Sequence, residues 1–278
     1  MRDRMAAMAP SLWPARLHHL RRDSPKPAPL AQFYGELLGD RVAPLPDGSW
    51  LVAGRNRRLV IGEGAAGSVP YFALELHDAA QLSAYRRELK HTEDFSSPLL
   101  GEGAFAVRDP DGRRVVFGVA KADAPSNGLP GRLQHFVCAT QRLPQMLEFY
   151  RRLGMVESDR VLEGEALAAV FLRSDPEHHS FAAFRASESR PDHHCYETTG
   201  WLDIRDWADR MGKLNIPLWW GPGRHGPGNN LFFMIEDPDG HKVEFSAELE
   251  LMPRDMPPRT WPHEQRTLNL WGSAWMRS

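Results

Sequence analysis

The sequence predicts an α+β protein built from two tandem units. Three observations lead to this fold class. A long stretch of the chain is repeated, each copy reads as a strand, a helix and then several strands, and a segment rich in Pro, Gly and Ser separates the copies. A length of 278 residues suits two medium-sized domains.

The repeat is visible at both ends of each copy. Leu17–Val42 resembles Leu133–Ser158, and Val107–Gly118 resembles Ile235–Ser246. The first pair is 116 residues apart (17 to 133) and the second is 128 apart (107 to 235). Spacings this long indicate two similar domains rather than a solenoid of short repeats.

The second copy shows the order of elements. A β-rich run at 133–139 precedes 143–154, where apolar residues recur at helical spacing until Gly154 ends the pattern. The elements that follow are strands at 166–174, 178–186 and 193–199, a helix at 201–214, and a hairpin at 229–247 that turns on Asp-Pro-Asp-Gly.

These patterns predict a first domain at 14–122, a second at 130–250 and a tail at 251–278. The linker between the domains is the Pro-, Gly- and Ser-rich stretch 121–131. The tail is too aromatic for a disordered segment, so we expect it to pack against the body of the protein.

Composition argues against several classes of protein. A net charge of −2 gives no basic surface for nucleic acid, and no apolar run approaches the ~20 residues of a membrane span. Residues 1–10 are charged and lack the hydrophobic core of a signal peptide. Two cysteines, Cys138 and Cys195, provide no disulfide framework, so we expect a cytoplasmic protein.

Three residues of the second unit form a candidate metal site. They are His135 on the first strand, His194 at the start of a later strand, and Glu244 in the hairpin. Two imidazoles and one carboxylate on one face of an ion leave other coordination positions open. That arrangement is typical of non-haem Fe(II) that binds a substrate and O₂ together.

The repeat supports a special role for Glu244. Aligned on the Asp-Pro-Asp-Gly turns, Glu244 corresponds to Val116, so this strand position accepts an apolar residue. A buried, unpaired carboxylate is costly, and a metal ion is the simplest partner for it. The position of the second ligand corresponds to Tyr71 or Phe72 in the first unit. Of the three candidate ligands, the first unit therefore keeps only one counterpart, His19.

A longer motif surrounds Glu244, and it resembles that of the two-domain type I extradiol ring-cleaving dioxygenases of the vicinal oxygen chelate superfamily. The resemblance extends from about Arg16 to the tail. The family motif runs Gly-x-His, a short spacer, an apolar residue, Tyr, Asp-Pro-x-Gly and Glu. It reads here as Gly223-Arg224-His225, seven residues, Phe233, Met234, Asp237-Pro238-Asp239-Gly240 and Glu244, with Met234 in place of the tyrosine.

The resemblance implies paired βαβββ modules that form a half-open barrel in each domain, with a metal only in the second. It makes His135, His194 and Glu244 the ligands of Fe(II), or occasionally of Mn(II). Of the adjacent histidines, the register of the resemblance favours His194. The reversed assignment, with His193 pointing inward, stays open.

The resemblance also implies roles for five other residues. His179 falls at the position of the acid–base histidine. His225 falls at that of a histidine that hydrogen-bonds near the bound substrate and oxygen. Trp220, Met234 and Tyr196 are expected to contact the substrate, although an aromatic residue such as Trp220 is as readily part of the core.

The implied reaction is cleavage of a substituted catechol by O₂ beside its diol, in aromatic catabolism, giving a muconic semialdehyde type product. The metal lowers the pKa of the catechol hydroxyls, and a histidine moves the proton. The tail resembles the C-terminal lid of the branch that acts on carboxylated or substituted catechols. Such relatives are usually oligomers, so a homo-oligomer is expected.

Met234 is where the sequence departs from the family motif. A thioether donates no hydrogen bond, so the donor that the tyrosine supplies is missing. Two alternatives therefore stay open. One is a metal-dependent glyoxalase-like lyase or isomerase of the same fold that works without O₂, and the other is a non-enzymatic binding or resistance module.

Overall fold

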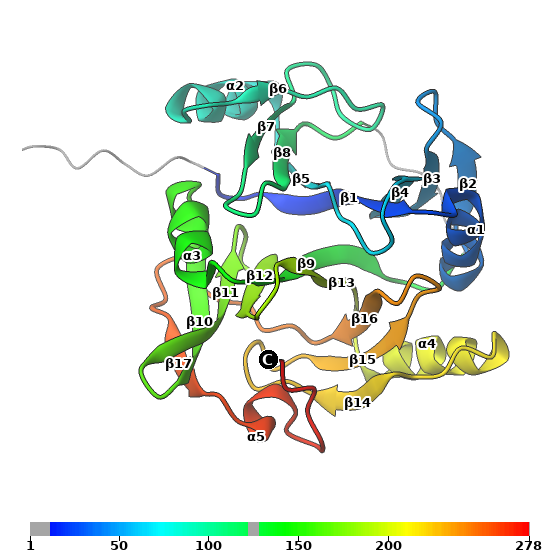
Figure 1. Cartoon of the computed structure of the whole chain (residues 1–278), viewed down its shortest axis with the longest axis vertical. Coiled ribbons are helices and arrows are strands. Elements are labelled where there is room, and N and C mark those ends of the chain that lie inside the picture. Colours follow the sequence, from blue (N-terminus) through cyan, green and yellow to red (C-terminus); the bar gives the residue numbers. More distant parts are fainter. Residues whose placement is uncertain (1–11, 122–127, 278) are drawn as a thin grey trace, which may run out of the picture.

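The structure, a computed structural model, describes residues 12–121 and 128–277. It confirms an α+β protein of two tandem units, each built on one mixed β-sheet (Figure 1). Residues 1–10, expected not to be a signal peptide, and residues 122–127 of the predicted linker lie outside the described residues. No helix in the described part of the chain has the length and hydrophobicity of a membrane span.

The first sheet has eight strands in the order β2-β3-β4-β1-β5-β8-β7-β6. Its strands are β1 (Arg16–Ser24), β2 (Arg41–Pro44), β3 (Trp50–Gly54), β4 (Arg57–Glu63), β5 (Tyr71–Glu75), β6 (Glu93–Asp94), β7 (Phe105–Arg108) and β8 (Arg114–Gly118), and its helices are α1 (Pro27–Leu38) and α2 (Ala79–Glu88).

The second sheet has nine strands in the order β14-β15-β16-β13-β9-β12-β11-β10-β17. Its strands are β9 (Arg132–Thr140), β10 (Val156–Glu163), β11 (Ala166–Arg173), β12 (Phe181–Arg185), β13 (Arg190–Thr198), β14 (Trp220–Arg224), β15 (Leu231–Glu236), β16 (Lys242–Ala247) and β17 (Arg259–Pro262), and its helices are α3 (Leu143–Arg152), α4 (Trp201–Lys213) and α5 (Gln265–Leu268).

The two strand orders confirm the repeat. β9 to β16 occupy in the second sheet the places that β1 to β8 occupy in the first, and the parallel pairs β1/β4 and β5/β8 recur as β9/β12 and β13/β16. The tail packs against the body, as expected. Its strand β17 pairs with β10 and extends the second sheet.

The predicted helical face of the second unit is also confirmed. On α3, Leu143, Met146 and Tyr150 are buried, because residues three and four apart share one side of a helix. The helix ends two residues before Gly154, whose φ of 93° is one that glycine adopts without strain.

One hydrophobic core joins the two sheets. β1 and β9 are in contact across the middle of the molecule (Figure 1). The ring of Phe72 in the first unit lies 5.3 Å from that of Phe136 in the second, and Tyr150 stacks on Phe181 at 3.9 Å. The first unit therefore supports strand β9, which carries part of the candidate site.

Candidate active site

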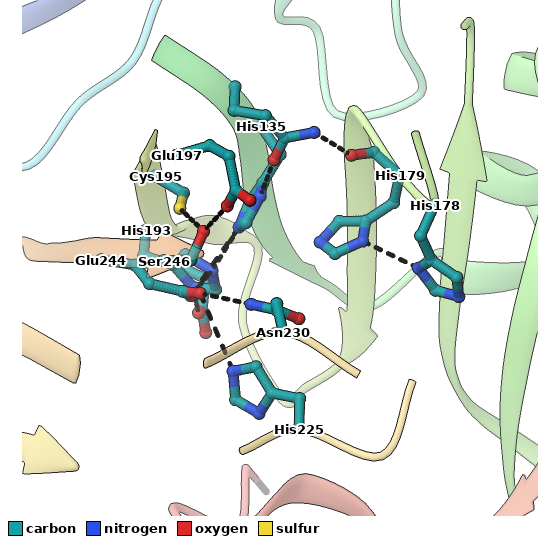
Figure 2. A network of polar contacts seen from close by, with 12 residues as sticks. His135, His178, His179, His193, Cys195, Glu197, His225, Asn230, Glu244 and Ser246 are labelled. Carbon is teal, nitrogen blue, oxygen red and sulfur yellow. Dashed lines mark hydrogen bonds and ion pairs between the residues drawn. The ribbon is translucent and has the colours of Figure 1, made fainter. Parts of the chain in front are cut away.

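Three side chains from neighbouring strands converge in the second unit. His135 lies on β9, His193 on β13 and Glu244 on β16, and these strands are adjacent in the sheet. Nε2 of His135 lies 3.3 Å from Nε2 of His193 and 3.7 Å from Oε2 of Glu244. Nε2 of His193 lies 3.1 Å from the same oxygen (Figure 2). All three residues are buried.

These three atoms fit one divalent metal ion. Ligand atoms bound about 2.1 Å from an ion, at octahedral or tetrahedral angles, lie roughly 3.0–3.5 Å apart. The observed separations are close to that range. Two imidazole nitrogens and one carboxylate oxygen form the donor set typical of non-haem Fe(II), and they also suit Mn(II). The site therefore needs little rearrangement to hold an ion.

The predicted second ligand, His194, does not converge with His135 and Glu244, and its neighbour His193 does. Successive residues of a strand point to opposite faces of the sheet, so only one of the pair reaches the site. Cys195 pairs with His135 on one side and with Glu244 on the other. The site face of β13 therefore carries Cys195 and, two residues earlier, His193.

His194 faces away from the site, towards the first unit. Its Nδ1 lies 3.0 Å from Nε2 of His241, and its ring is 5.9 Å from that of Tyr34. Burial lowers the pKa of His194 well below the usual value, so this imidazole is neutral. Tyr196 points the same way and packs near Phe245 at 5.8 Å. Tyr196, expected to contact the substrate, is thus not among the residues that line the cavity beside the site.

Each of the two converging imidazoles is held through its other ring nitrogen. Nδ1 of His135 donates to Oε1 of Gln134 at 2.5 Å, and Nδ1 of His193 donates to Oδ1 of Asp192 at 2.5 Å. When the rings are neutral, these hydrogen bonds leave Nε2 without a hydrogen and directed at the site. Metal-binding histidines in proteins are usually oriented in this way.

Glu244 is held in its charged form. Nδ2 of Asn230 donates to its Oε1 at 3.2 Å. Burial opposes ionisation of this carboxyl, but contacts with His135 and His193 outweigh burial and hold its pKa well below the usual range. Burial likewise opposes protonation of His193, yet contacts with Asp192 and Glu244 raise its pKa. The carboxylate thus provides the negative charge that a buried cation requires.

His179 and His225 lie beside the three converging residues, where they were expected. The ring of His179 is centred 4.4 Å from that of His135, and Nε2 of His225 lies 3.8 Å from Oε1 of Glu244. Nδ1 of His225 donates to the carbonyl of Leu268 at 2.5 Å. Burial lowers the pKa of His179 well below the usual value and that of His225 to about 4, so both are neutral at pH 7.

A small cavity of about 30 Å³ lies over these side chains. Met234 is in its wall and pairs across the hairpin with Glu244, so the thioether faces the site at the position of the family tyrosine. The wall is otherwise mostly apolar. Besides the histidines, Glu244 and Met234, it consists of Val137, Phe171, Phe184, Pro227, Thr267, Leu268 and Arg277.

Trp220 lies behind the cavity and is not among the residues that line it. Its ring is 5.6 Å from that of His225, and its Nε1 donates to the carbonyl of Ser273 at 2.8 Å. The indole therefore joins β14 to the tail and supports His225. The expected substrate contact of Trp220 does not match this position.

Several residues at the site were not predicted from the sequence. One is Cys195, whose sulfur lies within 4.8 Å of the ligand atoms of His135 and Glu244. Phe171 and Val137 had given no signal, because an apolar strand residue looks the same in a core and in a cavity wall. Asp192 did give one, since it directly precedes a histidine and carboxylates commonly orient metal-binding imidazoles.

Part of the chain matches a known protein family. Residues 132–245 match the family model described as Glyoxalase/Bleomycin resistance protein/Dioxygenase superfamily. Among curated proteins, metapyrocatechase 2 of Cupriavidus necator is 30% identical over 174 residues, which are 62% of this chain and 50% of that protein. The chain thus spans half the length of this relative.

Solved structures share the fold over almost the whole chain. Homoprotocatechuate 2,3-dioxygenase from Arthrobacter globiformis has a TM-score of 0.82 at 24% identity, covering 97% of this chain and 91% of that one. The homoprotocatechuate 2,3-dioxygenase of Brevibacterium fuscum, in complex with 3,4-dihydroxyphenylacetate, has a TM-score of 0.82 at 23% identity, covering 99% and 93%. Residues 132–245 therefore resemble a domain of the Glyoxalase/Bleomycin resistance protein/Dioxygenase superfamily, and the chain as a whole has the two-domain fold of the homoprotocatechuate 2,3-dioxygenases.

Proposed function

We propose that the protein is an Fe(II)-dependent extradiol dioxygenase, which opens the ring of a catechol with O₂ beside the diol and gives a muconic semialdehyde type product. The observation that carries this proposal is the convergence of His135, His193 and Glu244 beside a buried cavity. The names of the relatives support the reaction class. Mn(II) is the second choice of metal, because it accepts the same donors.

The protein's own residues supply the proton transfer. A bound Fe(II) would lower the pKa of the catechol hydroxyls and bind O₂. His179 is neutral and borders the same cavity, so it is placed to accept a hydroxyl proton and later to return it. His225 approaches Glu244 from another side of the cavity, where it is placed to hydrogen-bond to the substrate.

The wall of the cavity favours a catechol with an uncharged, apolar ring substituent. Val137, Phe171, Phe184 and Leu268 present hydrocarbon to it. Arg277 is the one arginine or lysine among the described residues of the wall, and two hydrogen bonds commit it to Asp192. A carboxylated substituent would lose its hydration without gaining a cation in return.

The cavity is too small for a catechol as it stands. Benzene fits an engineered cavity of about 150 Å³, several times the volume seen here. Thr267 and Leu268 belong to the tail and close one side of the cavity. We infer that this part of the tail moves when a ring enters.

The test is oxygen uptake after anaerobic reconstitution with Fe(II). The panel contains catechol, 3-methylcatechol and 4-methylcatechol, together with the carboxylated 3,4-dihydroxybenzoate and 3,4-dihydroxyphenylacetate. We expect O₂ uptake and a yellow product with the uncharged catechols, and kcat/KM at least tenfold lower with the carboxylated ones. Glu244→Gln is the negative control. No uptake with any member of the panel would refute the dioxygenase, whereas faster turnover of the carboxylated members would refute the substrate class alone.

A metal-dependent lyase or isomerase is the second candidate. The observation that favours it is Met234, which places no hydrogen-bond donor beside the metal site. Such an enzyme would not consume O₂. Product formation from a candidate substrate under argon would select this alternative.

A further inference from the structure

The tail does more than cover the cavity. It sends two arginines, Arg277 and Arg259, into the second unit. Arg277 ends on a buried aspartate that holds the site residue His193, and Arg259 ends on one that holds His178, the neighbour of His179. Neither arginine contacts one of the three converging ligand residues directly. Each reaches the site through its aspartate.

The first chain of contacts leads from Arg277 to His193. Nε and Nη2 of Arg277 donate to Oδ2 and Oδ1 of Asp192, both at 2.8 Å, and Oδ1 accepts the hydrogen bond from Nδ1 of His193. The side chains of the arginine and the aspartate are 4% and 0% exposed. The guanidinium lies 4.0 Å from the ring centre of Phe184 and 3.9 Å from that of Trp275. Its position is thus fixed on both sides.

The second chain of contacts leads from Arg259 to His179. Nε and Nη2 of Arg259 donate to Asp159 at 2.8 and 3.0 Å, and Nε1 of Trp261 donates to the same carboxylate at 2.8 Å. Oδ2 of Asp159 lies 2.9 Å from Nε2 of His178. Nδ1 of His178 in turn lies 2.9 Å from Nδ1 of His179 (Figure 2). Arg259 and Trp261 belong to β17.

These contacts select the tautomers of the site histidines. An ionised carboxylate only accepts hydrogen bonds, so Nε2 of His178 carries the hydrogen and its Nδ1 is an acceptor. Nδ1 of His179 must then be the donor, which leaves Nε2 of His179 with a free lone pair. That nitrogen is the one able to accept a proton. By the same rule Asp192 keeps Nε2 of His193 free for a metal.

The arginines keep both aspartates ionised. Arg277 donates to both oxygens of Asp192 in a two-pronged, charge-assisted pair, which matches the carboxylate form. Burial opposes ionisation of Asp159, and contacts with His178 and Arg259 outweigh burial. A protonated aspartate would be able to donate a hydrogen bond, and the choice of histidine tautomer would be lost.

We propose that the tail is a working part of the site, in which Arg277 and Arg259 are positioning residues, the first for the metal ligand His193 and the second for the acid–base residue His179. The catalytic consequence rests on the proposed function. The effects on metal affinity and on histidine tautomers do not, because they are properties of the protein without a substrate.

The two arginines serve as controls for each other. We expect Arg277→Gln to weaken Co(II) binding by about ten- to a hundredfold, as loss of a residue that orients a ligand commonly does, and to change the visible spectrum of the Co(II) protein. Arg259→Gln should bind Co(II) within about twofold of the wild type. Millimolar guanidinium should restore part of the affinity to Arg277→Gly and none to Arg259→Gly.

Histidine ¹⁵N NMR spectra of the metal-free protein measure the effect on the tautomers. In Arg259→Gln, His178 and His179 should lose their single tautomers, whereas in Arg277→Gln they should keep them. With Fe(II) and a catechol, Arg259→Gln should lower kcat with little change in KM. Asp159→Asn and Asp192→Asn repeat the comparison if either arginine variant fails to fold.

The proposal predicts a crossed pattern, in which Arg277→Gln changes Co(II) affinity and Arg259→Gln changes the tautomers of His178 and His179. If both arginine variants change Co(II) affinity and tautomers alike, or if neither changes them, the positioning roles are refuted. If the crossed pattern holds but the wild type consumes no O₂ with any catechol, the proposed reaction fails and the positioning roles stand.

Discussion

The hydroxyl of Tyr34 in the first unit donates a 2.8 Å hydrogen bond to Oδ2 of Asp237 in the second. The repeat produces the reciprocal contact, because Tyr150 in the second unit donates to Oδ2 of Asp109 in the first at 3.3 Å. Both tyrosines occupy the same place in the repeated helix, and both aspartates begin an Asp-Pro-Asp-Gly turn. Each unit therefore holds the turn of the other. The turn of Asp237 leads into β16, which carries Glu244.

Tyr34→Phe should lower the free energy of unfolding by about 1–3 kcal/mol, because it removes a buried donor to a charged carboxylate. Tyr150→Phe should cost less, since its hydrogen bond is longer. Urea unfolding of the two variants, followed by tryptophan fluorescence, measures both effects. Equal costs, or a larger cost for Tyr150→Phe, would contradict the ranking.

Exchanging each member of the histidine pair tests the corrected metal site. His193→Gln should abolish stoichiometric binding of Fe(II), because it removes one of three converging donors. His194→Gln should keep one ion per chain, since its ring faces Tyr34 and His241. Anaerobic Fe(II) titration with elemental analysis gives the stoichiometry. The reverse result would restore the original prediction of His194.

Met234→Tyr should raise turnover of catechols. A hydroxyl beside the site would donate one hydrogen bond to a charged group, worth about 1.5–3 kcal/mol, which corresponds to roughly ten- to a hundredfold in rate. Met234→Phe is the matched control, because it adds the ring without the donor. Stopped-flow product formation compares the three proteins. A gain in Met234→Phe equal to that in Met234→Tyr would show that the ring, rather than the hydroxyl, is responsible.

Glu197 should make stability depend on pH. Burial raises its pKa from 4.5 to about 7, although Ser246 and the N–H of Leu249 donate to it. The folded protein therefore holds this proton more tightly than the unfolded chain, so the free energy of unfolding falls as pH rises from about 4.5 to about 7 and then levels off. The shift is equivalent to about 3 kcal/mol.

Glu197→Gln isolates this effect. Relative to the wild type, the variant should gain about 3 kcal/mol between pH 4 and pH 8, because glutamine does not titrate. Urea unfolding at several pH values gives the difference between the two proteins. A difference that stays constant over this range would show that Glu197 has an ordinary pKa in the folded state.

Much of the fold was predictable because the chain repeats itself. The strand order of the second sheet follows that of the first. The Asp-Pro-Asp-Gly turns located β16 and hence Glu244, whose carboxylate has no counterpart in Val116. The cavity was not predictable, since its wall combines β9, β11, β12 and the tail, which no local pattern connects.

The choice between His193 and His194 depended on strand register, which the local sequence leaves open by one residue. The strand pairing of the first unit identifies the ligand position. Ala73 pairs with both His19 and Val116, just as Cys195 pairs with both His135 and Glu244. Counting two residues back from Ala73 reaches Tyr71, so the equivalent of Tyr71, rather than of Phe72, is the ligand position.

The pairing of β17 with β10 limits how the tail can bend. Residues 259–262 are hydrogen-bonded into the sheet along four register positions, and Arg259 is anchored on Asp159. The hinge for admitting a substrate therefore falls after Pro262. The part that can move lies between Pro262 and the anchored Arg277, and it must release the hydrogen bonds from Gly226 to Thr267 and from His225 to Leu268. The contacts that lead to His179 persist during that movement.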